Sequence, residues 1–220
     1  MRIAILGGTG DIGEGLALRW AKDTDHEVLV GSRDAARAQD AASAYLAELD
    51  DRGIDASIAG FENAAAAERG DVVVLAVPPY YVADTIGAID DLIDDAVLVS
   101  PAVGLGRDES GFHHDPPPAG SITAHAANAA PEGVPVVGTF HNLPAARLAD
   151  LDADLGLDTP VVGEAGAGKE TVLDLVDAID GLRGLDAGGI GNAPEAEGMV
   201  PLLLNVAANE DLEDIGMRFD

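Results

Sequence analysis

The chain has 220 residues, with 40 acidic residues against 12 basic ones and no cysteine. The resulting net charge of −28 leaves no basic face that would neutralise phosphates, so we expect no nucleic-acid partner. The absence of cysteine excludes disulfides, thiolate nucleophiles and cysteine-ligated zinc, and no apolar run approaches the length of a membrane span.

The first half of the chain alternates short apolar segments with longer segments of helical spacing. The apolar segments predict strands over residues 1–8, 26–32, 55–60, 71–79 and 95–101. The intervening segments predict helices over residues 11–23, 33–53, 62–70 and 81–93. Alternation of this kind predicts an α/β fold, a Rossmann-type doubly wound sheet whose strands are parallel and joined by right-handed crossovers.

The second half of the chain begins with a different composition. Residues 102–133 are rich in Gly, Pro, Ala and His, which predicts a long loop of functional importance. A sixth strand is expected over 134–140. The remaining segments predict a helix over 169–181, a short strand or turn over 182–188, and a C-terminal helical segment over 194–210.

A glycine motif follows the first predicted strand. Gly8, Gly10 and Gly13 form the pattern G-x-G-x-x-G at the start of a helix. In a Rossmann unit these glycines allow a tight turn, a close approach to a pyrophosphate and close helix–sheet packing, while the helix N-terminus attracts the phosphates. The alternative is a glycine turn that binds no ligand.

The end of the second predicted strand indicates which nucleotide is bound. NAD-binding versions of the motif place an acidic residue there, whereas this chain has Gly31 and Ser32, followed by Arg33 and, one helical turn on, Arg37. Guanidinium groups and hydroxyls are suited to a phosphate. We therefore expect the 2′-phosphate of NADP here, with Ser32 and Thr9 as hydroxyl donors.

The loop after the fourth predicted strand lies at the carboxyl edge of the sheet, where doubly wound folds bind ligands. Val77, Pro78 and Pro79 stop the strand and fix this loop. Tyr80 or Tyr81 would then flank the cofactor. Packing of either tyrosine beneath the loop is an equal alternative.

The acidic residues are dispersed along the chain rather than gathered in one block. One alternative for Arg37 is therefore an ion pair with Asp34 or Asp40 of the same helix. A dispersed, Asp-rich and Lys-poor surface is typical of cytosolic proteins from extreme halophiles, where molar salt screens the carboxylates. We expect a halophilic protein in the cytoplasm.

Several stretches together resemble the NADPH-dependent reductases of coenzyme F420, a deazaflavin. They are "MRIAILGGTGDIGEGLALRWA", "EVLVGSR", "VLAVP", "LVSP", "FHNLPAARLADLD" and "IDGLRGLDAG". The resemblance implies an oxidoreductase that transfers a hydride between NADP(H) and F420, and it implies a homodimer. It also implies an NADP-binding Rossmann domain over residues 1–145 and a small α/β cap over residues 146–220 that contributes to the deazaflavin cleft.

The resemblance also assigns site residues by position. His141, Leu143 and Pro144 match the segment that lines the deazaflavin pocket, and Glu197 matches a position near the ring. Three further positions of that region, Pro194, Gly198 and Val200, lack the polar side chains of the family. The expected NADP contacts are Gly8, Thr9, Gly10, Asp11, Ile12, Gly13, Ser32, Arg33, Arg37, Val77, Pro78 and Pro79.

Other functions remain open at the sequence level. His141 would donate a hydrogen bond to the deazaflavin, or it would only orient the "FHNLP" turn. The spacing of His113, His114, Asp115 and His125 matches no usual metal motif, so we expect no metal. The chain would otherwise be an NADP-dependent reductase of a small carbonyl or imine compound, or a non-enzymatic module that senses NADP.

Overall fold

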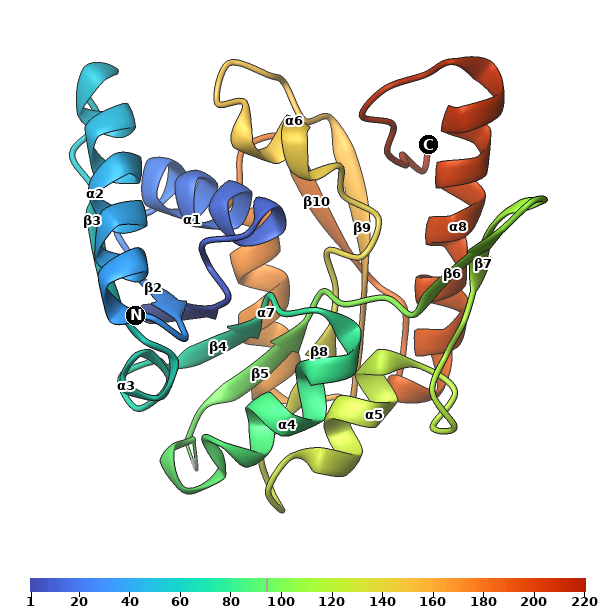
Figure 1. The fold of residues 1–220 in the computed structure, drawn as a ribbon, viewed down its shortest axis with the longest axis horizontal. Coiled ribbons are helices and arrows are strands. Elements are labelled where there is room, and N and C mark those ends of the chain that lie inside the picture. Colours follow the sequence, from blue (N-terminus) through green and yellow to red (C-terminus); the bar gives the residue numbers. More distant parts are fainter. Residues whose placement is uncertain (94) are drawn as a thin grey trace.

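A computed structural model describes residues 1–93 and 95–220 and contains an eight-stranded central sheet (Figure 1). Its strand order is β10-β9-β8-β5-β4-β1-β2-β3, so the connections reverse direction between β1 and β4. The strands of this sheet are β1 (Arg2–Leu6), β2 (Glu27–Ser32), β3 (Ser57–Glu62), β4 (Val72–Leu75), β5 (Val97–Ser100), β8 (Val136–Gly138), β9 (Leu157–Gly163) and β10 (Leu182–Asp186).

Helices cover both faces of the sheet because alternate strand residues are apolar on both sides. Helices α1, α2, α6 and α7 share one hydrophobic core with the sheet, and α3, α4 and α5 share the other. The helices are α1 (Asp11–Asp23), α2 (Ala35–Asp51), α3 (Asn63–Ala67), α4 (Val82–Gly87), α5 (Ile122–Ala129), α6 (Ala145–Ala149), α7 (Ala167–Asp177) and α8 (Ala193–Glu210). The predicted Rossmann-type fold is confirmed.

The prediction of one long loop over residues 102–133 is wrong. This segment contains an antiparallel hairpin, β6 (Leu105–Asp108) and β7 (Gly111–His114), followed by α5. Asp108 accepts hydrogen bonds from the backbone N–H and the hydroxyl of Ser110 in the hairpin turn. Ser121 caps α5 by accepting from the N–H of Ala124 at 2.9 Å. These local polar bonds order a stretch whose composition suggested a loop.

The prediction that the sheet is parallel throughout is also wrong, because β9 was not predicted and runs antiparallel to β8. Pro160 lies inside this strand and weakened the strand pattern. The N–H of Asp158, two residues earlier, bonds to the Met217 carbonyl rather than to β8. Pro160 faces that same edge, and β8 pairs only with Val162 and Gly163, so no ladder bond is lost.

The proposed domain boundary at residue 145 falls at the start of α6. Strands β9 and β10 lie beyond it and extend the same sheet, and the division into two domains stays a prediction. At one end of the molecule, the hairpin β6–β7 lies beside α8 (Figure 1). Among the described residues, no helix is long and apolar enough to cross a bilayer.

Candidate functional site

The loop between β1 and α1 is shaped by its glycines. Gly7 has a φ of +79°, and a Cβ there would lie 2.3 Å from the Ala76 carbonyl oxygen, so only glycine fits. A Cβ at Gly10 would meet only the Gly7 carbonyl, at 3.5 Å, so the surface beyond Gly10 is open for a ligand. Gly10 is also the N-cap of α1 and supplies no side-chain cap.

The first turn of α1 therefore presents free backbone N–H groups beside that open surface. They belong to Asp11, Ile12 and Gly13, which were predicted to contact NADP. Tyr45 of α2 supports the loop from below, because its buried hydroxyl donates to the Gly8 carbonyl at 3.0 Å. The loop is thus held rigidly in a shape that suits a pyrophosphate.

Basic side chains gather where β2 ends. Ser32 is buried, whereas Arg33 and Arg37 are exposed. Asp34 uses its carboxylate to cap α2, accepting from the N–H of Ala36 at 2.9 Å. Neither Arg33 nor Arg37 forms an ion pair with a described residue, so the pairing of Arg37 with Asp34 or Asp40 is not observed. Both guanidinium groups are available to an anion.

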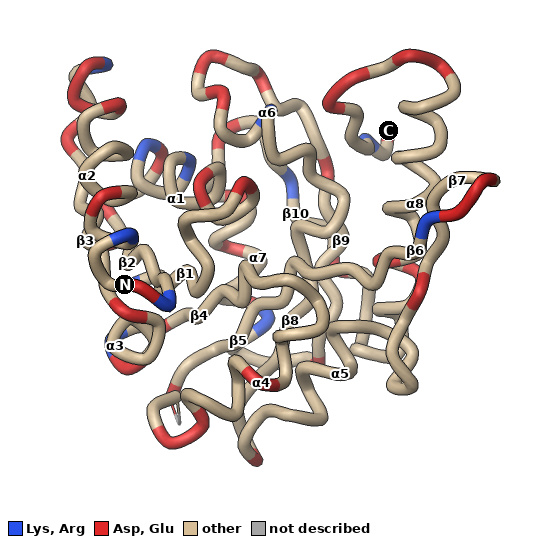
Figure 2. Tube along the Cα trace, viewed as in Figure 1, with Lys and Arg blue, Asp and Glu red and all other residues tan. Residues whose placement is uncertain are grey.

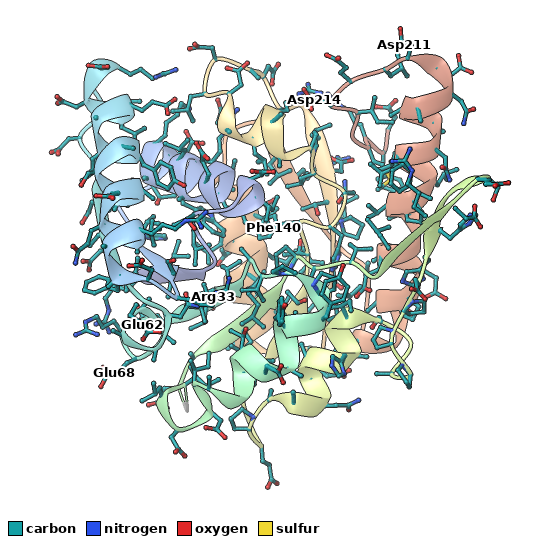
Figure 3. The ribbon with its side chains drawn as sticks, viewed as in Figure 1. Arg33, Glu62, Glu68, Phe140, Asp211 and Asp214 are labelled. Atoms are coloured by element: carbon teal, nitrogen blue, oxygen red, sulfur yellow. The ribbon has the colours of Figure 1, made fainter. Side chains whose placement is uncertain are left out.

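A cavity of about 660 Å³ joins the glycine loop to these arginines. Figure 3 shows Arg33 and Glu62 at the side of the sheet where β2 and β3 end. The cavity, which we call the first region, is lined by Gly7, Thr9, Gly10, Ser32, Arg33, Asp34, Arg37, Glu62, Asn63, Ala64, Ala76, Val77, Pro78, Tyr81, Asp84, Thr85, Ala88 and Ile89. Its volume and its mixed lining are typical of a small-molecule site.

Seven of the twelve predicted NADP contacts line this cavity. They are Thr9, Gly10, Ser32, Arg33, Arg37, Val77 and Pro78. The other five do not line it; they are Gly8, Asp11, Ile12, Gly13 and Pro79. Of the two tyrosines, Tyr81 lines the cavity, whereas Tyr80 is 81% exposed.

Asn63 also lines the cavity, although the sequence did not predict it as a site residue. Its Oδ1 atom is buried and has no hydrogen-bond partner among the described residues. Asn63 directly follows β3, which ends beside β2 with Glu62 level with Ser32. Its position at the carboxyl end of a strand is the signal that would have found it. An unpartnered carbonyl oxygen in the cavity wall suits a hydrogen-bond donor such as an amino or hydroxyl group of a ligand.

A second region lies at the ends of β5 and β8. We define it as Ser100, Thr123, residues 139–144 and Glu197. Phe140 has a φ of +65°, a strained value for a non-glycine residue, and its N–H donates to Thr159 Oγ1 at 3.1 Å. Asn142 accepts from the same hydroxyl at 2.9 Å and donates to the Asp158 carbonyl at 2.8 Å. Strand β9 thus fixes the turn that carries His141.

His141 is buried in this turn, with 6% of its surface exposed. Burial lowers the pKa of His141 to about 4, and the backbone of Ser100 opposes the shift only in part. Its Nε2 atom lies 3.5 Å from Thr123 Oγ1, and its Nδ1 atom has no partner of hydrogen-bond geometry among the described residues. The imidazole is therefore neutral at pH 7 and has one free nitrogen.

Glu197 is fully buried and lies across the start of α5. Its carboxylate accepts from the N–H groups of Ile122 and Thr123, each at 2.9 Å, and from the Thr123 hydroxyl at 3.0 Å. His114 Nε2 lies 3.6 Å from the same carboxylate. Glu197 therefore ties α8 to α5 and to the hairpin, a role that the sequence did not indicate.

The other predicted residues of the second region differ in exposure. Leu143 is packed into the core, with 8% of its surface exposed, whereas Pro144 is half-buried at the N-cap of α6. His113, His114, Asp115 and His125 do not converge. No cluster of three metal-binding side chains occurs among residues 1–93 and 95–220.

The chain is similar to proteins of one family over nearly its whole length. Residues 2–104 match the family model described as NADP oxidoreductase, coenzyme F420-dependent. An F420-dependent NADP reductase of Methanocaldococcus jannaschii is 37% identical over 99% of this chain and 97% of that protein. A protein of the same name from Methanothermobacter thermautotrophicus is 36% identical over 99% of this chain and 94% of that protein.

The fold is also similar to solved structures. A protein from Arthrobacter sp. FB24, provisionally assigned as an F420-dependent NADP-reductase, superposes with a TM-score of 0.80 at 22% identity. The likeness covers 100% of this chain and 99% of that one. A likeness at 22% identity shows the fold alone, whereas the two relatives at 37% and 36% identity show the family.

Proposed function

The chain belongs to the coenzyme F420-dependent NADP oxidoreductases, and from that premise we propose how its residues divide between the two coenzymes. The protein is an NADP-dependent oxidoreductase that transfers a hydride between NADP(H) and F420. Both rings carry the redox chemistry themselves. The protein therefore has to bind, align and shield them rather than supply a nucleophile.

We assign NADP to the first region. The observation that carries this assignment is the combination of Ser32, Arg33 and Arg37 in one cavity with the open surface at Gly10. A 2′-phosphate would bind the two guanidinium groups and the Ser32 hydroxyl, with Thr9 nearby as a further hydroxyl donor. The first turn of α1 would hold the pyrophosphate, and Val77 and Pro78 would lie toward the nicotinamide.

We assign the deazaflavin to the second region, beside His141 and the turn that ends at Pro144. The buried, unpartnered Nδ1 of His141 supports this assignment, because a ring N–H of the reduced deazaflavin can donate to it. Leu143 would support the turn from the core rather than touch the ring. Pro194, Gly198 and Val200 lie on α8, and they supply none of the polar side chains that the family pattern implies there.

The direct test is spectroscopic. Oxidised F420 added without oxygen to the protein and NADPH should lose its deazaflavin absorbance at molar salt. If the protein binds NADPH but leaves that absorbance unchanged, F420 is not its redox partner. An NADP-dependent reductase of a small carbonyl or imine substrate would then replace this proposal.

We further propose that the enzyme is a homodimer joined through α8. Leu202 is 62% exposed and Val206 40% exposed, one helical turn apart on the outer face of that helix. Light scattering should give twice the chain mass, and Leu202→Glu should halve it. A monomeric wild-type protein at micromolar concentration would contradict the dimer.

We also propose a halophilic, cytoplasmic enzyme without a nucleic-acid partner. Acidic residues occur in many separate segments of the fold, and basic residues are few (Figure 2). Molar salt shortens the Debye length to about 3 Å and screens these charges from each other and from the two anionic coenzymes. NADP binding as tight in dilute buffer as in molar salt would contradict the halophilic interpretation.

A further inference from the structure

Three of the buried polar atoms without a hydrogen-bond partner lie in or beside the second region. Among the described residues they are Ser100 Oγ, His114 Nε2 and His141 Nδ1. The fourth such atom belongs to Asn63, in the first region. Because unpaired buried polar atoms are costly, their concentration at one place points to a function beyond packing.

Two of these atoms stand at opposite ends of a row of polar side chains. His114 Nε2 lies 3.6 Å from Glu197 Oε2. Glu197 Oε1 lies 3.0 Å from Thr123 Oγ1, which in turn lies 3.5 Å from His141 Nε2. Thr123 and Glu197 are fully buried, whereas the His114 side chain is 20% exposed. The row therefore runs from solvent to the buried imidazole.

The outer end of the row is held in place by α8. Asn205 accepts from the N–H of Phe112 and donates to the Phe112 carbonyl, each at 2.8 Å, and so binds β7 as a neighbouring strand would. Gly198 lies against the ring of His114, since a Cβ there would be in ordinary contact with His114 Nδ1, at 3.8 Å. His114 is thus positioned opposite Glu197 by specific contacts.

We propose that His114, Glu197, Thr123 and His141 form a proton relay between solvent and the deazaflavin. The proposal rests on the proposed function, because that reaction requires a proton. Oxidation of the reduced deazaflavin by NADP⁺ moves a hydride to the nicotinamide and releases one proton from the ring nitrogen. The reverse reaction takes up one proton. A site closed to water needs a path for it.

The observed hydrogen bonds have the direction that proton release requires. The Thr123 hydroxyl donates to Glu197, so it accepts from an N–H at His141 Nε2 and leaves His141 Nδ1 with a free lone pair. A proton accepted at Nδ1 displaces the Nε2 proton to Thr123, and the hydroxyl proton moves to Glu197 Oε1. Rotation of the carboxyl group then brings that proton to the side of Glu197 that faces His114 Nε2, which accepts it. One proton enters and one leaves through His114. When the Thr123 hydroxyl rotates to donate to His141 Nε2, the proton can move along the row in the opposite direction.

The electrostatic setting suits transfer rather than storage of the proton. The pKa of His141, lowered to about 4 by burial, makes its imidazolium short-lived. Among residues 1–93 and 95–220, no charged side chain contributes to the pKa shift of this imidazole, and its polar neighbours are Ser100 from β5 and Thr123 from α5. The charged partner that faces His114 is Glu197 of α8.

The first test uses the free protein and nitrogen NMR of the histidine rings. His141 should be neutral and carry its proton on Nε2, and Thr123→Val should shift it toward a mixture of tautomers. A proton on Nδ1 of wild-type His141 overturns the relay.

The second test follows proton release with a pH indicator while reduced F420 reacts with NADP⁺ in a single turnover. In His114→Gln the proton should appear at least about tenfold later than the hydride transfer, at the lower end of general acid–base effects. His113→Gln is the matched control, since the exposed His113 bonds to Ser110 and Asp108 away from the row. Equal proton-release rates in both variants overturn the relay.

The two tests separate this inference from the proposed function. If wild-type protein does not oxidise reduced F420, the assignment of the deazaflavin fails whatever the NMR spectra show. If it turns over normally in His114→Gln with prompt proton release, the function stands and the relay fails.

Discussion

The two regions of this enzyme are built in different ways. The first region consists of a loop and an adjacent strand end that are close in sequence. Arg33 and Arg37 are exposed there and line the cavity. The second region assembles buried side chains from β5, α5, α8 and the turn after β8, and the partly exposed His114 of the hairpin lies beside it, opposite Glu197. The proposed phosphate site therefore comes from a local motif, while packing of distant elements forms the second region.

The two regions are physically joined by Arg19. This buried arginine of α1 donates hydrogen bonds to the carbonyls of Arg147, Leu148, Asp150 and Ala153 around the end of α6. The helix whose N-terminus we assign to the pyrophosphate thus also holds the segment that follows His141. Substitutions in the first region, in the second region and at Arg19 should therefore show how far the two regions depend on each other.

The largest effect on stability should come from Arg19, which joins the two regions. Arg19→Leu removes four hydrogen bonds, of which only the one to the Asp150 carbonyl leaves an acceptor that keeps a backbone donor among the described residues, from Ala153, and it should cost about 3–5 kcal/mol of unfolding free energy. Urea unfolding at molar salt measures it. Arg52→Leu is the control, because Arg52 makes partly exposed ion pairs with Glu48 and Asp152 and one exposed hydrogen bond to the Glu48 carbonyl, and its loss should cost under about 1 kcal/mol. Equal costs would show that α1 and α6 do not depend on this contact.

The next largest effect concerns pH and the second region. The folded pKa of His141 is about 4 and lies below its unfolded value of about 6.5, so unfolding takes up a proton between these values. Stability should therefore be lost as pH falls from about 6.5 to 4, by up to roughly 3 kcal/mol.

The measurement is the urea midpoint of wild-type protein and His141→Asn across this pH range. The variant should lose the part of the slope that His141 contributes, whatever its stability at pH 7. An unchanged slope would contradict the burial of a neutral imidazole in the second region.

A smaller effect is expected from the first region. Arg33→Ala removes a charge-assisted contact to the 2′-phosphate and should weaken NADP binding by about 1.5–3 kcal/mol, while NAD binding barely changes. Calorimetric titrations with both nucleotides measure this difference. Arg107→Ala is the matched control, since Arg107 stacks on Phe112 in the hairpin. Equal losses for NADP and NAD would remove Arg33 from the phosphate site.

The smallest effects should come from two helix caps, one in each region. Asp34→Ala and Ser121→Ala each remove a side chain that accepts from the backbone N–H groups of a helix start, and each should cost about 1 kcal/mol of stability. Their effects on binding should differ. Asp34→Ala removes a negative charge from the cavity and should not weaken NADP binding, whereas Ser121→Ala should disturb the second region alone. Weaker NADP binding in Asp34→Ala would reverse this expectation.

The sequence alone determined the first region because its signals are local. Apolar segments ending in glycine predict strands β1 and β2, and the spacing of Gly8, Gly10 and Gly13 with Ser32 and Arg33 nearby requires no knowledge of distant residues. Asn63 was missed although it lies in the same cavity, because a single asparagine after a strand has no spacing that distinguishes it.

The residues of the second region could not be grouped from the sequence, because they come together only in the folded chain. Strand β9 contains a proline that is tolerated because β8 does not reach its free edge, a fact invisible in the strand's own residues. Glu197 and Thr123 are 74 positions apart, and His114 comes from a hairpin that the composition hid. Buried polar pairs are selected by distance in the folded chain rather than by spacing along it, so they follow from packing and not from a motif.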